Sequence, residues 1–259
     1  MMKTIIHQRS KMIILLLETL LIASTFYTIF QLFLPQSYKT LTQNVQRHFI
    51  LLLILFCYIV TSFLNSNFIL NYVYEHSHST LPWFFKVAAV WSGQEGSTLI
   101  FFIFAQGSFL LSCIFMCPTQ KNLLSQNQVL IKYILFQVIL MTGYIITSDL
   151  FALNIPYVPN EGTDLNPLLQ NYAMTYHPPF LLAGQAGFFA ISILSSLNSQ
   201  TSLHQTSVLF NKITYLSLGI LTLGITFGSM WAYNVLGWGG YWYWDPVENI
   251  SLIPWLLIY

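Results

Sequence analysis

Aromatic side chains are concentrated in one short stretch near the end of the chain. Four of the seven tryptophans fall between positions 231 and 244, with three tyrosines among them: Trp231, Trp238, Trp242, Trp244, Tyr233, Tyr241 and Tyr243. Glycines at 237, 239 and 240 interrupt the run and allow sharp turns and close backbone approach to another molecule. Because indole and phenol rings are large flat surfaces with one polar tip, the stretch predicts a site for a flat, mostly apolar ligand.

One histidine is placed to serve that ligand. His177 is followed by Pro178 and Pro179, which predict the beginning of a helix because proline in the first helical position loses no needed hydrogen bond. A histidine held beside a flat aromatic surface is suited to be an axial ligand of haem iron. The alternative is a histidine that caps the helix or lies at an interface. Two predicted membrane spans separate His177 from the aromatic stretch and so place both on the same side of a membrane, which favours the role of a haem ligand.

Other polar groups carry weaker signals. His76 and His78 are two residues apart, and in an extended segment they would point the same way, as a pair of metal ligands does. A third ligand at a suitable spacing is missing, so we expect solvated polar side chains. Asp245, Pro246 and Glu248 form the pattern Asp-Pro-x-Glu, which favours a structural role as a helix start with a reciprocal cap.

The composition indicates that these residues are carried by membrane helices. The chain is 55% hydrophobic and 7% charged, against about 25% charged residues in soluble domains, and its net charge of +1 gives no reason to expect nucleic acid. Six segments approach the ~20 apolar residues that a span needs: 12–34, 49–70, 97–116, 129–148, 180–197 and 213–231. A seventh begins near Ile250. We therefore expect an all-α, polytopic membrane helix bundle of six full spans plus the start of a seventh, with aromatic-rich external loops.

Charge separates the two sides of this bundle. Alternating spans place loops 71–96, 149–179 and 232–249 on one side, with seven of the eight acids: Glu75, Glu95, Asp149, Glu161, Asp164, Asp245 and Glu248. The opposite loops and their helix edges hold basic residues and no acid: Lys39, Arg47, Lys121, Lys132 and Lys212. Because lysine and arginine mark the cytoplasmic or matrix side, the acidic, aromatic loops should face the periplasm or intermembrane space. The N-terminus, with three basic residues, falls on that side too.

Several stretches together resemble a known family. Residues Trp238 to Asn249 (Trp-Gly-Gly-Tyr-Trp-Tyr-Trp-Asp-Pro-Val-Glu-Asn) resemble the tryptophan-rich WWD signature of haem-handling membrane proteins, most closely the CcmF family, the haem lyase subunit of cytochrome c maturation. Residues 81–97, 161–170 and 177–179 resemble the same family in the same order. Two positions depart from it: Tyr241 stands where tryptophan is usual, and Gln94 where some members have histidine.

The resemblance implies a division of the chain and a set of site residues. Residues 1–70 would be N-terminal membrane helices, and 71–259 a haem-handling membrane region that includes the external loop 149–179 and the WWD loop 232–249. His177 would be the axial ligand of the haem iron. The other haem-binding residues would be Trp231, Trp238, Gly239, Gly240, Tyr241, Trp242, Trp244 and Asp245.

The resemblance also implies a function and partners. The chain would be a subunit of a haem lyase, not active alone, that binds haem on the outer face of the inner membrane for attachment to the Cys-x-x-Cys-His motif of apocytochrome c. Family members continue far past Tyr259, so the second axial ligand is expected from a C-terminal companion fragment. A haem chaperone and membrane lipid complete the expected partners. Split forms occur in mitochondria, which favours a mitochondrial over a bacterial membrane; the rival explanation is an incomplete sequence.

Two other functions compete with the lyase. A haem exporter or delivery protein of the same superfamily would bind haem without attaching it. An unrelated respiratory or transporter subunit would place ionisable residues within its helices, whereas here Glu18 and Lys132 alone qualify, both near helix ends.

Overall fold

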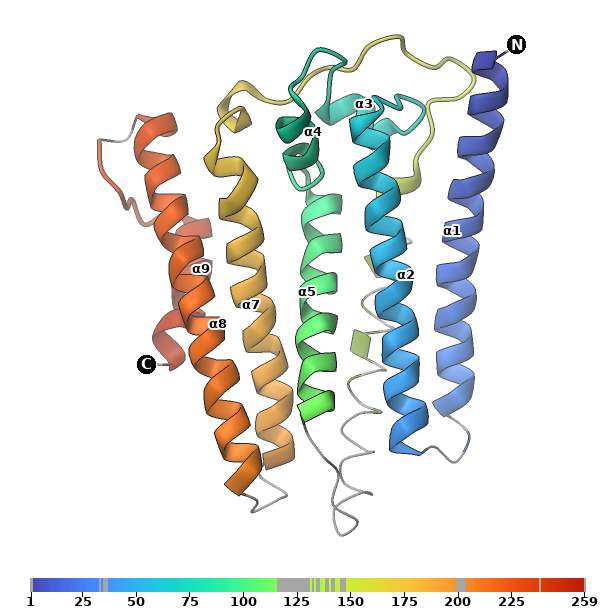
Figure 1. Cartoon of the computed structure of the whole chain (residues 1–259). Helices are drawn as coiled ribbons and strands as arrows, with labels where there is room; N and C mark the ends of the chain where they lie inside the picture. Colours follow the sequence, from blue (N-terminus) through green and yellow to red (C-terminus); the bar gives the residue numbers. More distant parts are fainter. Residues whose placement is uncertain are drawn as a thin grey trace. The chain divides into compact units, whose positions relative to one another are not determined.

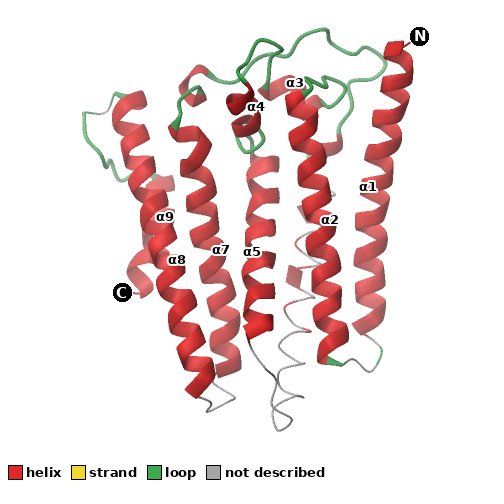
Figure 2. Ribbon diagram, in the orientation of Figure 1, coloured by secondary structure: helices red, strands yellow, loops and turns green. Residues whose placement is uncertain are grey.

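The described part of the chain is helical. A computed structural model describes residues 2–32, 34, 37–115, separate positions between 131 and 144, and residues 148–198, 204–237 and 239–258. Within these residues the regular elements are helices (Figure 2). The β-type pairing among them is limited to one isolated antiparallel bridge between Leu70 and Leu153. The expected all-α class is confirmed. The chain forms two compact units, Met1–Gly96 with Leu130–Asn166, and Ser97–Val129 with Pro167–Tyr259.

The first unit is built on two long helices that lie side by side, α1 (Met2–Leu32) and α2 (Tyr38–Leu64) (Figure 1). The Ser37 hydroxyl accepts a hydrogen bond from the Thr40 N–H and so caps α2. Apolar side chains three, four or seven residues apart form the buried stripes: Ile14, Leu17 and Leu21 on α1, and Leu41, Val45, Leu52, Leu55 and Ile59 on α2. Helix α2 ends before the expected residue 70, because the chain turns at Ser66, which has a φ of 51°.

Short helices follow on the expected external segments of this unit. Helices α3 (Asn71–His76) and α4 (Trp83–Ala89) come before α5, and a 3-10 turn, η2 (Asp149–Phe151), comes later. Lys86, the one charged residue within α4, is buried and donates from Nζ to the Ser66 hydroxyl at 2.8 Å and to the Ser79 carbonyl at 3.0 Å. Its charge is thus satisfied by fixed oxygens.

The second unit carries the long helices that position the aromatic stretch. From Ser97 onward, helix α5 (Gln94–Phe115) belongs to this unit. It is followed by η3 (Pro167–Leu169), α7 (Ala173–Asn198), α8 (His204–Trp231) and α9 (Pro246–Ile258). Helices α7 and α8 run side by side in opposite directions (Figure 1). The start of α9 at Pro246 confirms the helix predicted from the Asp-Pro-x-Glu pattern.

The start of α7 corrects one expectation. The prolines at 178 and 179 were expected to mark the first turn, but α7 begins at Ala173 and holds both of them inside the helix. Each proline removes an N–H that would have bonded four residues back, at the carbonyls of Met174 and Thr175. The prolines are the sixth and seventh residues of α7, beyond the four N–H groups that have no intrahelical partner, so the beginning of the helix lacks two of its hydrogen bonds. His177 therefore lies within the helix, one turn from its beginning.

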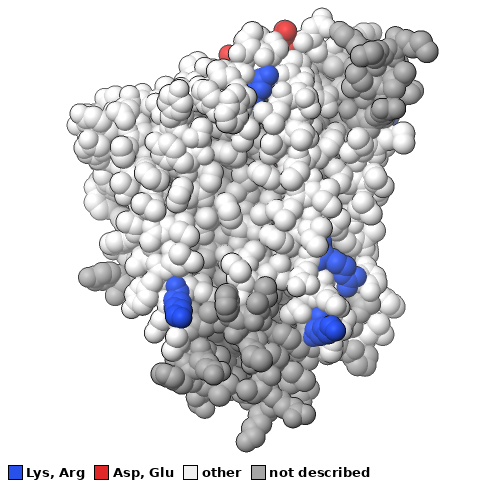
Figure 3. Space-filling view, viewed as in Figure 1, with Lys and Arg blue, Asp and Glu red and all other residues white. Residues whose placement is uncertain are grey.

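Hydropathy and length identify membrane spans among the described residues. Three helical segments qualify, Lys11–Phe30, Lys39–Leu64 and Phe210–Leu236. A fourth arises if α4 and Gln94–Leu111, bent by 80° at their junction, form one broken span. The face in Figure 3 shows few charged atoms over the described surface. The chain is a multi-pass membrane protein; six full spans remain a prediction, and the segment expected at 129–148 lies mostly outside the described residues.

Candidate functional site

Glycines bring α7 and α8 into close contact beneath the predicted ligand site. A methyl group added at Gly184 would lie 2.7 Å from the backbone of Leu221, and one added at Gly224 would lie 2.6 Å from the backbone nitrogen of Leu181. Small residues at such positions let two helix backbones approach, as they do in membrane bundles. Gly184 and Gly224 therefore form a tight packing seam, which fixes the distance between the two helices.

The same seam holds the imidazole of His177. Its Nδ1 lies 2.8 Å from the carbonyl oxygen of Gly224, and a methyl group added at Gly228 would lie 2.5 Å from its Cε1. The ring thus lies against the face of α8 formed by Gly224 and Gly228, two residues without a side chain. A carbonyl oxygen only accepts hydrogen bonds, so this contact favours the neutral tautomer in which Nδ1 carries the proton and Nε2 keeps its lone pair. Metal-binding histidines are commonly oriented in this way, with the second nitrogen donating to a carbonyl.

The aromatic stretch begins where α8 changes its winding. After Trp231 the chain continues as a π-helical turn, η4 (Ala232–Leu236), a form that is rare and frequent at functional sites. Gly237 and Gly239 follow with φ of 65° and 73°, a left-handed conformation that glycine adopts without steric cost. Across this turn the rings of Tyr233 and Tyr241 stack, with centroids 4.5 Å apart and planes inclined by 16°.

The acids after the aromatic stretch form a reciprocal cap on α9. The Asp245 carboxylate accepts from the Glu248 N–H at 2.6 Å, and the Glu248 carboxylate accepts from the Asp245 N–H at 3.3 Å. This is a capping box, which satisfies N–H groups at the helix start. The structural role expected for Asp245 and Glu248 is confirmed.

A small cavity lies between His177 and the aromatic stretch, within the second unit. Its volume is about 80 Å³, and residues from α7, α8, the loop and α9 line it, among them His177, Trp231, Trp242, Asp245, Glu248 and Ser251. Ligand pockets usually measure ~300–1,000 Å³, so this cavity can take an edge of a flat ligand but cannot enclose it. Within the described residues, the buried indole N–H of Trp242 has no hydrogen-bond acceptor, which leaves one donor for a ligand.

The predicted site residues fall into three groups. His177, Trp231, Trp242 and Asp245 line the cavity together. Tyr241 and Trp244 are exposed, while Gly239 and Gly240 form the turn between η4 and the tryptophans. Trp238 lies outside the described residues.

Sequence reasoning missed the role of Gly228 and the place of Glu248 at the cavity. Gly224 and Gly228 are four residues apart in the sequence, a spacing that favours close helix contact. The spacing alone could not show that a histidine from another helix lies against them.

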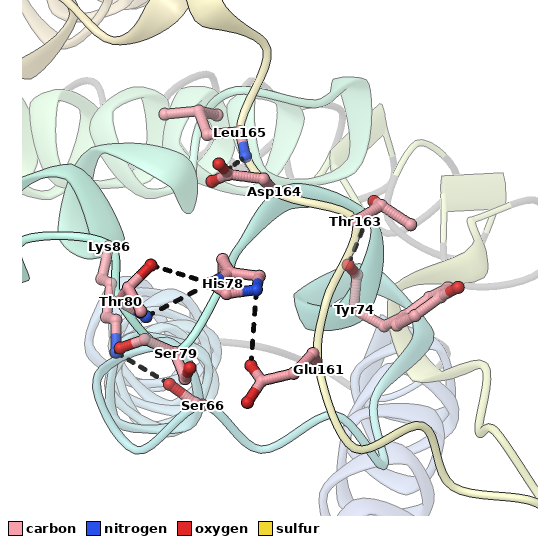
Figure 4. A network of polar contacts seen from close by, with 10 residues as sticks. All are labelled: Ser66, Tyr74, His78, Ser79, Thr80, Lys86, Glu161, Thr163, Asp164 and Leu165. Atoms are coloured by element: carbon pink, nitrogen blue, oxygen red, sulfur yellow. Dashed lines mark hydrogen bonds and ion pairs between the residues drawn. The ribbon is translucent and has the colours of Figure 1, made fainter.

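The two other histidines of interest have separate surroundings in the first unit. His78 is half-buried; its Nε2 lies 3.6 Å from the Glu161 carboxylate, and its Nδ1 lies 2.9 Å from the Thr80 hydroxyl (Figure 4). His76, expected to be solvated, is half-buried against the Tyr72 ring, with centroids 4.6 Å apart. The described residues hold no cluster of three metal-ligating side chains.

Glu161 ties the long loop of the first unit to the segment after α3. Hydrogen bonds from Ser79, and then the charges of His78 and Lys86, hold the pKa of the exposed Glu161 carboxyl below its ordinary value. Next to it, Thr163 donates to the backbone carbonyl of Tyr74 from its N–H at 2.8 Å (Figure 4). The segment 161–164 is therefore held in place by side chains and backbone together.

The glycines of the segment 91–97 build the bend between α4 and α5. The Tyr72 hydroxyl donates to the Val90 carbonyl at 2.9 Å and accepts from the N–H groups of Gly93 and Gly96 at 3.3 and 3.2 Å. A methyl group at Gly96 would overlap the Val90 carbonyl oxygen. Burial raises the pKa of the Tyr72 hydroxyl, which keeps it protonated and able to donate.

Comparison with known proteins places these features in a family. The Cytochrome C assembly protein family matches residues 13–259. The chain is 42% identical over 200 residues to the cytochrome c-type biogenesis protein NrfE of Haemophilus influenzae, and 38% identical over 211 residues to CcmF of Escherichia coli. These matches cover 76% and 78% of this chain but 31% of each relative, so the chain spans about a third of their length.

A solved structure agrees with this assignment. The structure titled Cytochrome c Heme Lyase CcmF matches 95% of this chain and 39% of its own, with a TM-score of 0.67 and 25% sequence identity. The sequence match and the fold therefore lead to the same relatives, and the chain belongs to the cytochrome c assembly protein family, with CcmF and NrfE among its relatives.

Proposed function

We propose that this chain is the haem-holding membrane portion of a cytochrome c-type haem lyase, with His177 as one axial ligand of the haem iron. The observation that carries the proposal is the state of the His177 imidazole. Its Nδ1 donates to the Gly224 carbonyl, so Nε2 is the nitrogen with a free lone pair, in a residue that lines a cavity with Trp231 and Trp242. An oriented imidazole beside indole rings is a suitable environment for haem iron.

The residues present fit haem chemically, but only as part of a site. The cavity offers one ligand nitrogen, mostly apolar walls that also include the carboxylates of Asp245 and Glu248, and an indole N–H of Trp242 that has no acceptor among the described residues. At about 80 Å³, it leaves most of a macrocycle to be covered by other surfaces. We propose that a C-terminal companion segment, corresponding to the remaining length of the relatives, supplies those surfaces and the second axial ligand.

In this function the chain holds and orients haem. When bound, haem supplies the vinyl groups that are joined to the two thiols of the Cys-x-x-Cys-His motif in apocytochrome c. His177 would bind the iron through Nε2, and the indoles of Trp231 and Trp242 would exclude water from one edge of the site. The thiols come from the substrate.

The distribution of charged residues supports a location for the haem site. The acids expected on one side of the bundle and the basic residues expected on the other favour an outward placement of the aromatic loop. We propose the inner membrane, mitochondrial rather than bacterial, with this loop in the intermembrane space. A haem chaperone would deliver the haem.

The test is a comparison of histidine variants in the presence of the companion. The chain and its companion are purified together, and haem absorption spectra are recorded for the unaltered protein, His177→Ala and His177→Gly. We expect haem to be lost from both variants and partly restored to His177→Gly by added imidazole. His78→Ala, in the first unit, is the control and should keep the unaltered spectrum. An unchanged spectrum in His177→Ala would show that the ligand assignment is wrong.

A second measurement separates attachment from delivery. Cells with the unaltered chain or with His177→Ala are assayed for covalently haem-bound cytochrome c and for free haem outside the membrane. If the chain is a lyase subunit, His177→Ala should lower the amount of covalently haem-bound cytochrome c. If His177→Ala lowers exported haem while added haem restores cytochrome c, the chain is a delivery protein and the lyase proposal fails.

A further inference from the structure

Trp244 has an unusual backbone for a bulky residue. Its φ is 59°, in the left-handed region where a side chain other than glycine, asparagine or aspartate meets steric strain. Its indole gains little burial in return, because 69% of the residue is exposed. Strain of this kind persists only where neighbouring groups impose it, and it is concentrated at functional sites.

Two side chains from the first turn of α9 impose this conformation. The Glu248 carboxylate oxygen Oε2 accepts from the N–H groups of Tyr243 at 2.9 Å and Asp245 at 3.3 Å, the residues on either side of Trp244. The Asn249 side chain donates from Nδ2 to the carbonyl of Trp244 at 3.0 Å. The peptide group that joins Trp244 to Asp245 is therefore held at both its N–H and its C=O.

The clamped residue stands beside the cavity. The Trp244 ring meets the ring of Trp242 edge to face, with centroids 6.0 Å apart and planes inclined by 86°, and Trp242 lines the cavity with His177. Left-handed backbone sends the side chain in a direction that an ordinary helical or extended residue would not. The clamp thus sets where the exposed indole lies relative to the cavity.

We propose that Glu248 and Asn249 are positioning residues that hold Trp244 in its strained conformation, so that its indole forms one wall of the site for a planar aromatic ligand of the porphyrin class. The inference rests on the proposed haem-holding function. It gives Asn249 a role that helix capping does not require, since Asp245 and Glu248 complete the cap between themselves.

The first test is Asn249→Asp. Aspartate keeps the shape and favours a helix N-terminus, but its carboxylate cannot donate to the Trp244 carbonyl. In the chain with its companion, we expect haem to bind about tenfold more weakly, the effect of one lost hydrogen bond to the site's backbone. Unfolding without haem should be unchanged or occur at a slightly higher temperature. Unchanged haem affinity would overturn the proposal.

The second test asks whether Asn249 acts through Trp244. Trp244→Gly removes both strain and indole, so we expect a higher unfolding temperature without haem and weaker haem binding. In that background Asn249→Asp should cost no further affinity, because the residue it positions is gone. A full, additive loss in the double variant would mean that Asn249 acts elsewhere.

A third variant protects the result from a folding artefact. Glu248→Gln keeps an acceptor oxygen and should bind haem nearly as the unaltered chain does, whereas Glu248→Ala should lose affinity. If Glu248→Gln loses as much as Glu248→Ala, the clamp is not the cause. An unaltered chain that binds no haem at all would refute the proposed function instead, while a higher unfolding temperature of Trp244→Gly would still support the strain.

Discussion

The contact between Gly228 and His177 predicts that one methyl group on α8 will weaken haem binding. In Gly228→Ala the new methyl would lie 2.5 Å from Cε1 of His177, 3.0 Å from Nδ1 and 3.1 Å from Nε2. Carbon atoms in favourable contact are ~3.5–4.0 Å apart, so the ring or the helix must move by about 1 Å. The ring cannot retreat without loosening its 2.8 Å hydrogen bond to the Gly224 carbonyl.

The expected magnitudes separate stability from binding. Overpacking of this kind costs ~1–3 kcal/mol, while replacing glycine by alanine within a helix gains about 1 kcal/mol. The free energy of unfolding should therefore fall by only ~0–2 kcal/mol, and the chain should still fold. Haem affinity should fall by about 10–100-fold, as when an outer partner of a metal ligand is altered.

A matched variant on the same helix makes the assay decisive. Gly219→Ala introduces the same methyl where, among the described residues, no atom outside the helix's own neighbouring backbone lies within 4 Å, so it should leave haem affinity unchanged and raise helix stability slightly. Both variants, with the companion present, are titrated with haem and their absorption spectra recorded; unfolding is measured without haem. If Gly228→Ala binds haem as tightly as Gly219→Ala and with the same spectrum, His177 is not the ligand that Gly228 positions.

Three further predictions concern the supports of the site. Tyr72→Phe should lower the free energy of unfolding by roughly 2–4 kcal/mol, because it leaves buried backbone groups at the α4–α5 bend unpaired; Tyr157→Phe, with Tyr157 88% exposed, is the control in the same denaturant titration. Gly184→Ala should push α7 from the Leu221 backbone and lower the unfolding temperature, and an unshifted temperature would argue against the tight seam. Because the folded-state pKa of Glu161 is lowered, its contribution to stability is complete above its ordinary pKa of 4.5 and is lost as pH falls through the folded-state value. The stability difference between the unaltered chain and Glu161→Gln should therefore close in acid, and a gap independent of pH would contradict the pairing.

Local patterns in the sequence predicted local structure well. Asp245, Pro246 and Glu248 predicted a helix start, and the reciprocal hydrogen bonds of a capping box are present because each partner lies within three residues of the other. Low charge and long apolar segments predicted membrane helices, since the hydrocarbon core demands them irrespective of how they pack. The predicted start of α7 was wrong, because its first turn begins at Ala173, before the prolines. Helix ends depend on weak local preferences and are therefore hard to predict.

What the sequence alone determined is the class of this protein: a helical membrane chain of the cytochrome c assembly family, with an aromatic stretch and a histidine suited to haem. Only the tertiary structure decided how that histidine is held. The proton on Nδ1 of His177 is set by the Gly224 carbonyl, which is 47 residues away in sequence. The ring's place is set by the missing side chain of Gly228. Contacts between helices arise from packing of distant segments, so neither spacing nor composition could reveal them.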